Sequence, residues 1–205
     1  SGEFRPTHDT TISVRVITRE GSRKVAEAAL ELARARRKKL TVVHKNTVFK
    51  LGCGMFVEEC YKAAEAYPDV EVEEAIVDTF AMHLIRHPQQ YDVVVTTNMF
   101  GDILTDEAAV LAGSLGMLPS SSLAGIPRED TRGGRSALGL YEPIHGSAPD
   151  IAGQGKANPI ATILSVALML RYSLGLPQAA SALEAAVDGV LNQGYRTQDI
   201  AEDGA

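Results

Sequence analysis

Apolar and polar positions alternate along the first part of the chain in a way that predicts strands separated by helices. Short apolar runs, which are typical of buried strands, lie at residues 10–18, 40–43, 70–77 and 91–96. Apolar positions at helical spacing follow the first three runs, over residues 23–37, 55–67 and a shorter stretch that ends before Pro88. Ser22 is the expected N-cap of the first helix, and residues 1–9 are expected to be irregular. This alternation favours an α/β fold, with a mainly parallel or mixed sheet flanked by helices.

The pattern changes after Gly116. Residues 119–135 are rich in Ser, Gly, Pro and charge, which predicts a mobile loop. A short strand over 137–141, a loop over 142–159 and two helices, at 160–174 and 178–191, are expected to follow. The first of these helices is apolar on almost every side and should therefore be buried on several sides. We place a domain boundary near Ala112, which gives domains at 1–112 and 113–205.

Composition excludes several kinds of partner. The chain has 205 residues, 45% of them hydrophobic, and a net charge of −6, which suits a compact core and argues against nucleic acid. The basic cluster at 34–39 ends a predicted helix, where cations suit the helix dipole. The longest apolar run, 159–170, is too short to span a membrane. Cys53 and Cys60 form no CxxC pair, as expected of reduced thiols in a cytoplasmic protein.

The helix that follows the strand at 91–96 carries two acids. It is predicted to begin at Gly101, so Asp102 and Asp106, four residues apart, lie on one face of its first turns. Two carboxylates that point the same way repel each other unless a cation lies between them, and carboxylate oxygens are ligands that Mg²⁺ prefers. The simpler interpretation is that both acids only favour a helix N-terminus.

Two more polar residues stand at strand ends. Lys45 follows the run at 40–43, and Asp78 follows the run at 70–77. Ligands gather at the carboxyl ends of strands in open α/β sheets, so Asp78 could complete a metal site with Asp102 and Asp106. A lysine next to such carboxylates can accept a proton. Taken singly, Lys45 and Asp78 are more typical of surface residues.

A second candidate site is the loop between His145 and Pro159. Its small residues would let backbone N–H groups approach a phosphate closely, and Asp150 could accept hydrogen bonds from a ribose diol. No GxGxxG fingerprint follows a strand in this chain. Gly52-Cys53-Gly54 is only a fragment of one, and we interpret it as a turn.

Two long motifs resemble a known family. Residues 98–106 (Asn-Met-Phe-Gly-Asp-Ile-Leu-Thr-Asp) and 142–159 (Glu-Pro-Ile-His-Gly-Ser-Ala-Pro-Asp-Ile-Ala-Gly-Gln-Gly-Lys-Ala-Asn-Pro) are similar to the β-decarboxylating dehydrogenases of isopropylmalate, isocitrate, homoisocitrate and tartrate. The resemblance covers essentially the whole chain, and residues 81–86, 113–119 and 194–197 look closest to the isopropylmalate branch. It implies a small dimerisation and active-site domain at 1–112, and the C-terminal part of a nucleotide-binding large domain at 113–205.

The resemblance also implies roles for single residues. Asp102 and Asp106 of one subunit would hold Mg²⁺ or Mn²⁺ together with Asp78 of the other subunit of a homodimer. Lys45, also from that other subunit, would help to remove the hydroxyl proton of a small-molecule substrate. The implied reaction is oxidative decarboxylation of a 3-substituted malate, with 3-isopropylmalate (leucine biosynthesis) favoured over homoisocitrate, isocitrate or tartrate. A catalytically inactive dimerisation fragment is the alternative from another class.

The implied cofactor is NAD, whose adenosine half would lie against the second motif. Asp150 followed by Ile151 resembles the NAD-preferring pattern, because an acid pairs with a ribose 2′-hydroxyl and repels a 2′-phosphate. The residues implied in cofactor binding are Glu142, His145, Gly146, Ser147, Ala148, Asp150 and Asn158.

Some features depart from the family pattern. The family sequence begins before Ser1, so the resemblance implies that a tyrosine and the arginines that grip the malate carboxylates lie outside this chain, which alone would be inactive. Thr47 stands where the family usually has Asn near the nicotinamide ribose. The stretch 124–136 is longer than expected. His83 and His87 have zinc-compatible spacing but no third ligand in view, so we expect surface histidines.

Overall fold

A computed structural model describes residues 2–125, 128–129 and 135–201. The chain divides into two compact units, Ser1–Asp102 and Ile103–Ala205, which are described separately below. The division falls within helix α4 (Asn98–Ala112), near the start of that helix, whereas the sequence placed a domain boundary at its end.

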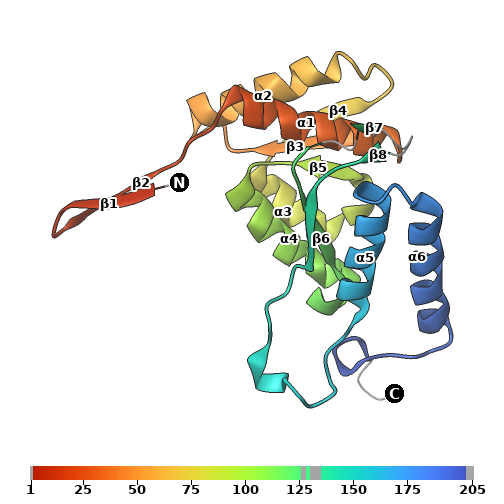
Figure 1. The fold of residues 1–205 in the computed structure, drawn as a ribbon. Helices are drawn as coiled ribbons and strands as arrows, with labels where there is room; N and C mark the ends of the chain where they lie inside the picture. Colours follow the sequence, from red (N-terminus) through yellow and green to blue (C-terminus); the bar gives the residue numbers. More distant parts are fainter. Residues whose placement is uncertain (1, 126–127, 130–134, 202–205) are drawn as a thin grey trace. The chain divides into compact units, whose positions relative to one another are not determined.

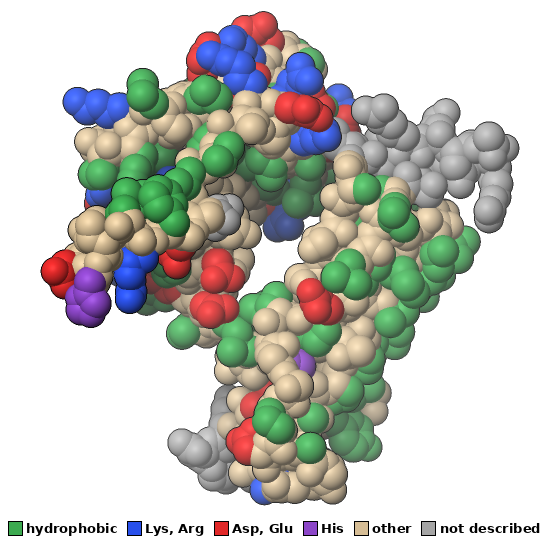
Figure 2. All heavy atoms as spheres, turned by 60° about the vertical axis from the view of Figure 1, so that its left-hand side comes forward, with side chains coloured by type: hydrophobic (Ala, Val, Ile, Leu, Met, Phe, Trp, Pro, Cys, Tyr) green, Lys and Arg blue, Asp and Glu red, His purple; other side chains and the backbone are tan. Residues whose placement is uncertain are grey.

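Unit 1 begins with a hairpin of β1 (Gly2–Thr7) and β2 (Thr10–Val14), which pair antiparallel. The prediction that residues 1–9 are irregular was therefore wrong for β1, because the strand has no buried face to give it an alternating pattern. The hairpin extends away from the helices of its unit (Figure 1), and every residue in both strands is exposed. Phe4, Ile12 and Val14 are among them, and hydrophobic side chains (green in Figure 2) also stand elsewhere on the surface. An isolated two-stranded hairpin is marginally stable in water.

A three-stranded parallel sheet forms the centre of unit 1. Its strands are β3 (Lys39–His44), β4 (Glu71–Ile76) and β5 (Val93–Val95), in the order β4-β3-β5. The predicted parallel sheet is thus confirmed, although β4 and β5 are shorter and β3 is longer than expected. All three carboxyl ends lie at one edge, because the pairing is parallel throughout.

Three α-helices and a short 3₁₀ helix complete unit 1 before α4: α1 (Arg19–Arg34), α2 (Lys50–Ala64), α3 (Val77–Arg86) and η1 (Pro88–Gln90). Helix α1 begins earlier than predicted, because the Thr18 hydroxyl, and not Ser22, caps it by accepting the Gly21 N–H at 3.1 Å. Gly52 lies inside α2, so the predicted turn was wrong. A Cβ at Gly52 would stand 3.2 Å from Ile17, which indicates that the glycine permits close packing.

The core of unit 1 lies where α1 and α2 cover β3 and β5. Its buried members include Leu30, Leu40, Val42, Phe56 and Val95. Both cysteines are buried and unpaired, as the sequence predicted. The core therefore fixes the sheet whose carboxyl edge carries the candidate site.

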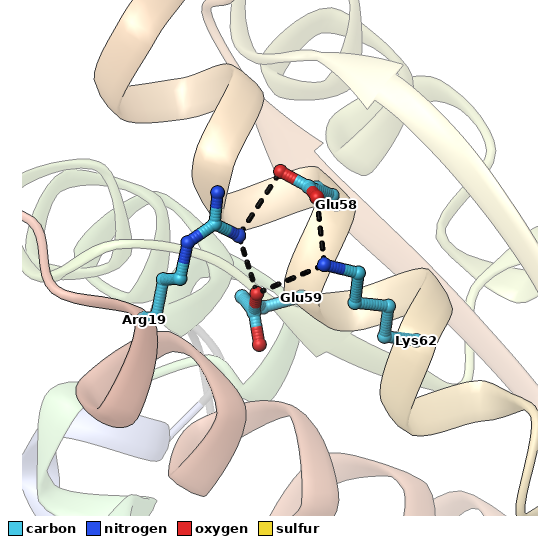
Figure 3. Close-up of polar contacts among 4 residues, drawn as sticks. All are labelled: Arg19, Glu58, Glu59 and Lys62. Atoms are coloured by element: carbon cyan, nitrogen blue, oxygen red, sulfur yellow. Dashed lines mark hydrogen bonds and ion pairs between the residues drawn. The ribbon is translucent and has the colours of Figure 1, made fainter.

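A cluster of ion pairs joins the start of α1 to α2 (Figure 3). Arg19 Nη1 lies 2.6 Å from Glu59 Oε1 and 3.1 Å from Glu58 Oε2. Lys62 Nζ lies 2.7 Å from Glu58 Oε1 and 3.6 Å from Glu59 Oε1. Glu59 is the one buried residue of these four. A buried carboxylate without a cation would destabilise the fold, so the ion pair with Arg19 offsets the cost of burying Glu59. The hydrogen bonds from Lys62 and then Arg19 lower the pKa of Glu58 below its usual range.

Unit 2 contains the antiparallel pair β6 (Pro119–Leu123) and β9 (Gly139–Pro143). Both strands pack against α5 (Ile160–Tyr172), which in turn packs against α6 (Pro177–Asn192). The predicted loop at 119–135 was wrong at β6, a serine-rich strand held by its ladder and by Ser120 Oγ, which donates to the Glu142 carbonyl at 2.9 Å. The shorter elements are β7 (Arg128–Glu129), β8 (Arg135–Ser136), η2 (Leu115–Met117), η3 (Pro149–Ile151) and η4 (Gln198–Ile200). Positions 126–127 and 130–134 of the predicted loop lie outside the described residues.

Helix α5 is less buried than its composition suggested. Within α5 only Ala161, Ser165 and Ala167 are buried, and Val166 is 40% exposed. Arg171 of α5 forms two 2.8 Å hydrogen bonds to the Glu184 carboxylate of α6, which fixes the helix pair. No helix in the described part of the chain is long and apolar enough to cross a membrane.

Candidate active site

Lys45 and Asp78 meet at the carboxyl edge of the parallel sheet. Lys45 directly follows β3, and Asp78 lies in the first turn of α3, just beyond β4. Because His44 pairs with Ile76 in the sheet register, the two side chains emerge next to each other, and Lys45 Nζ forms an ion pair with Asp78 Oδ2. The Lys45 side chain is 23% exposed and that of Asp78 is 63% exposed, so the pair lies at the surface of the edge.

The residue before Lys45 stabilises the turn that presents it. His44 is buried, and its Nδ1 accepts the Asn46 N–H at 3.2 Å while Nε2 lies 2.9 Å from Glu74 Oε2. The Lys45 carbonyl then accepts the Phe49 N–H at 2.8 Å, which leads the chain into α2. Sequence reasoning missed His44. A histidine at the end of an otherwise apolar strand was the available signal.

Arg15, which was also not predicted from the sequence, holds the N-terminal end of α4 in place. Arg15 lies between the hairpin and α1, and its Nη2 donates to Thr97 Oγ1 at 2.6 Å. Its guanidinium lies 5.2 Å from the ring centroid of Phe49 and 5.3 Å from that of Phe100, within cation–π range. Arg15 therefore ties the segment after Lys45 to the first turn of α4. A pocket of about 300 Å³ adjoins it.

Asp102 and Asp106 both lie on α4, one turn apart, and both are exposed. Phe100 and Leu104 are the buried residues of this stretch, so the acids occupy the opposite, solvent-facing side. Within the described part of the chain, no three His, Cys, Asp or Glu side chains come together as a metal site. The donor type suits Mg²⁺ or Mn²⁺. Among the described residues, no third metal-binding side chain joins His83 and His87 either.

The predicted cofactor loop belongs to unit 2. Glu142 is the penultimate residue of β9, and Ser147, Ala148 and Asp150 are exposed in the loop and in η3 that follow it. Ala148 has a left-handed φ of 44°, a conformation that non-glycine residues rarely adopt. His145 Nδ1 lies 2.8 Å from the Gly146 carbonyl, which turns the ring back onto the loop. Residues 146 to 150 are all exposed, so this part of the loop is available to a ligand.

The Asn158 side chain bonds to residues outside the loop, whereas the His145 side chain bonds within it. Asn158 Nδ2 donates to Asp199 Oδ2 at 3.0 Å, and Asn158 Oδ1 accepts the Ile160 N–H at 3.0 Å. Asp199 also accepts a 2.5 Å hydrogen bond from Ser114 Oγ. Neither Ser114 nor Asp199 was predicted, since a lone Ser and a lone Asp far apart in sequence give no pattern.

The family model of isocitrate/isopropylmalate dehydrogenase matches residues 2–205. A 3-isopropylmalate dehydrogenase of Dehalococcoides mccartyi is 53% identical over 204 residues, 100% of this chain and 53% of that protein. One of Heyndrickxia coagulans is 52% identical over 195 residues, 95% of this chain and 50% of that protein. The chain thus spans about half the length of the curated relatives that it matches.

Solved structures give the same result for the fold. The isocitrate dehydrogenase of Methylococcus capsulatus aligns with a TM-score of 0.84 at 42% identity, over 98% of this chain and 57% of that one. A β-decarboxylating dehydrogenase of Thermococcus kodakarensis aligns with a TM-score of 0.79 at 42% identity, over 97% of this chain and 56% of that one. The chain is a member of the isocitrate/isopropylmalate dehydrogenase family.

Proposed function

We propose that this chain takes part in the NAD-dependent oxidative decarboxylation of a 3-substituted malate, and that the substrate is 3-isopropylmalate. Curated relatives about half identical to the chain carry that substrate in their names, which supports the choice. Isocitrate is the nearest alternative, because a structural neighbour at 42% identity is named an isocitrate dehydrogenase. Homoisocitrate and tartrate belong to the same proposal as further alternatives.

The observation that carries the proposal is the Lys45–Asp78 ion pair at the carboxyl edge of the sheet. Acid–base catalysis requires a proton-transfer group held in a defined place. Asp78 holds the Lys45 side chain in place, and the hydrogen bond from the Asn46 N–H to His44 Nδ1 fixes the turn beneath it. In the proposed reaction Lys45 Nζ, as a neutral amine, would receive the proton of the substrate hydroxyl, and the hydroxyl-bearing carbon would become a ketone as its hydride passes to the nicotinamide cofactor. The β-carboxylate would then leave as CO₂, and its bonding electrons would remain on the product as an enolate that is protonated afterwards.

The proposed metal ligands are Asp102 and Asp106 of one copy and Asp78 of a second copy. All three supply carboxylate oxygens, and the exposure of all three in one chain suits a site that closes only between two copies. When bound, Mg²⁺ or Mn²⁺ supplies positive charge that polarises a substrate oxygen. This arrangement implies a homodimer, in which residues 1–112 act as the dimerisation and active-site part.

The proposed nucleotide site is the loop that begins at Glu142, within the part of the chain at 113–205. His145, Gly146, Ser147, Ala148, Asp150 and Asn158 are the residues assigned to the adenosine half of NAD. Residues 146 to 150 are exposed, and the backbone N–H groups of all of them except Pro149 would be offered to polar groups of the nucleotide, while the exposed Asp150 carboxylate would accept from a ribose diol. When bound, NAD accepts the hydride from the hydroxyl-bearing carbon.

The test is a turnover assay with a panel of malates: 3-isopropylmalate, isocitrate, homoisocitrate and tartrate. It is run on the 205-residue chain and on a chain extended to the length of its relatives. We expect NADH formation with 3-isopropylmalate by the extended chain, and its loss in Lys45→Met. A Lys50→Met variant serves as control, since Lys50 is an exposed lysine at the start of α2. Turnover of another substrate, or none at all in the extended chain, would overturn the assignment.

A non-catalytic role as a dimerisation module is the second candidate. It is favoured by the fully exposed hairpin, whose apolar side chains suit pairing with another copy. Dimer formation without nucleotide or metal binding would support this role over the enzymatic one.

A further inference from the structure

The Asp199 carboxylate joins three segments of unit 2. Its Oδ2 accepts hydrogen bonds from Ser114 Oγ at 2.5 Å and from Asn158 Nδ2 at 3.0 Å. Ser114 is the N-cap of η2, Asn158 ends the loop that begins at Glu142, and Asp199 lies in η4. Burial acts to raise the pKa of Asp199, but the hydrogen bonds from Ser114 and other neighbours outweigh it, so its pKa lies below the ordinary value.

The Asn158 side chain has little bonding capacity left for a ligand. Its amide nitrogen donates to Asp199 and lies 3.5 Å from the Met117 sulfur, while its oxygen accepts the Ile160 N–H at the start of α5. An amide side chain carries two donor hydrogens and one acceptor oxygen, and each now has a partner in the protein. What the Asn158 position can still offer a ligand is its backbone.

A glycine closes the third side of this cluster. A Cβ at Gly116 would stand 2.8 Å from Asn158 Cβ, closer than such atoms approach, and 3.0 Å from Asp199 Oδ2, which is a tight contact. Gly116 does not have a positive φ, so its role is close approach and not a turn. The end of the loop is therefore seated against η2 and η4, whereas Gly146 to Asp150 remain exposed.

We propose that Asp199 is a positioning residue for the cofactor-binding loop. Its carboxylate holds Asn158, and through Asn158 it fixes the conformation in which the loop presents the backbone of residues 145–150. Asn158 acts here as a strut, and its side chain does not recognise the nucleotide. The identity of the ligand rests on the proposed function, but the fastening of the loop does not.

The test compares Asp199→Ala with Asp199→Asn in the 205-residue chain. An asparagine oxygen can still accept from both Ser114 and Asn158, so Asp199→Asn should behave nearly like the unchanged chain. Asp199→Ala should speed hydrogen exchange of the amides in 145–158 by about tenfold, the usual effect of losing one hydrogen bond to a charged group. Asp188→Ala, which removes an exposed acid of α6, is the matched control and should change nothing in that segment.

Binding of NAD and of ADP-ribose, measured by calorimetry, gives the second readout. Asp199→Ala should weaken both about tenfold, and Asp199→Asn should leave them within about twofold. Asn158→Ala and the Asn158→Ala/Asp199→Ala double variant complete a cycle. If Asp199 acts through Asn158, hydrogen exchange in 145–158 should be no faster in the double variant than in Asn158→Ala alone, and its affinity for NAD and ADP-ribose should be no lower. If the effects of the two single substitutions add up in the double variant, Asp199 does not act through Asn158, and the proposal is wrong.

The remaining outcomes separate this inference from the proposed function. Unchanged exchange in 145–158 of Asp199→Ala overturns the positioning role even if NAD binds. Faster exchange in a chain that never binds NAD supports the fastening and counts against the nucleotide site. If circular dichroism shows that Asp199→Ala does not fold, Asp199→Ser replaces it, because a serine is too short to reach Asn158 but keeps a small polar group.

Discussion

At the scale of single residues, Asp102 gives the most direct test of the proposed metal site. It is exposed on α4, one turn before Asp106, so replacing it should not disturb the buried face of the helix. We expect Asp102→Asn to weaken Mn²⁺ binding about tenfold or more, because a neutral amide replaces a charged oxygen ligand. Asp9→Asn, at the tip of the hairpin, is the control. Equal Mn²⁺ affinities in calorimetry would remove Asp102 from the site.

Asp150 and Ile151 provide the residue-scale test of cofactor choice. In a chain extended to the length of its relatives, Asp150→Lys with Ile151→Tyr should shift preference from NAD towards NADP. The change removes an acceptor for the ribose diol and adds a cation for the 2′-phosphate. The measurement is the ratio of kcat/KM for the two cofactors. Since both positions belong to η3, Pro149→Ala is a control that alters the same turn without altering charge. An unchanged ratio would mean that the adenosine ribose lies elsewhere.

The residue scale also shows what sequence could predict of the site. Lys45 and Asp78 follow apolar runs, so the sequence could predict that each lies at a strand end. The parallel pairing of β3 and β4 then places the two side chains in contact. Arg15 and Asp199 could not be found in this way. Each acts through a partner that is close only in the folded chain, such as Thr97 for Arg15.

At the scale of elements, the ion-pair cluster between α1 and α2 is the feature to test. Arg19→Met keeps an apolar stem but leaves the buried Glu59 carboxylate without its nearest cation. We expect the thermal midpoint of unfolding to fall by several degrees, because a buried carboxylate without its partner is costly. Glu58→Gln should change it little, since Glu58 is exposed. Circular dichroism melts would measure both. An Arg19→Met midpoint equal to that of the unchanged chain would show that Glu59 needs no pairing.

Elements differed in how far the sequence predicted them, and the cause was burial. Strands β3 and β5 read correctly because helices cover them and their apolar runs are continuous. Strand β1 is exposed throughout and β6 is serine-rich, so neither carries a hydrophobic signal. Helix α2 was predicted to start too late because Gly52 suggested a turn, whereas its missing side chain makes room for Ile17.

At the scale of the whole molecule, the surface of a single chain is incomplete in two ways. Hairpin β1–β2 exposes Phe4, Ile12 and Val14, although a two-stranded ribbon gains stability only when it is covered or paired. The apolar residues Met82, Ile85 and Ile103 are also at least 45% exposed on α3 and α4. Exposed apolar area of this kind is typical of a surface that meets another protein.

We therefore predict that the 205-residue chain is a dimer with little or no dehydrogenase activity of its own. A second copy would cover the hairpin and bring its Lys45 and Asp78 to Asp102. Activity should be low because the resemblance assigns the carboxylate-gripping arginines and a catalytic tyrosine to the part of the relatives that this chain does not span. Orientation and proton transfer together contribute many orders of magnitude to a rate.

Analytical ultracentrifugation and an NADH assay are the measurements. Ile12→Glu should shift the dimer towards monomer, whereas Thr11→Glu, which adds the same charge to β2 without removing an apolar side chain, should do so less. A monomeric unchanged chain would contradict the pairing, and rapid NADH formation from 3-isopropylmalate would show that the chain holds a complete active site.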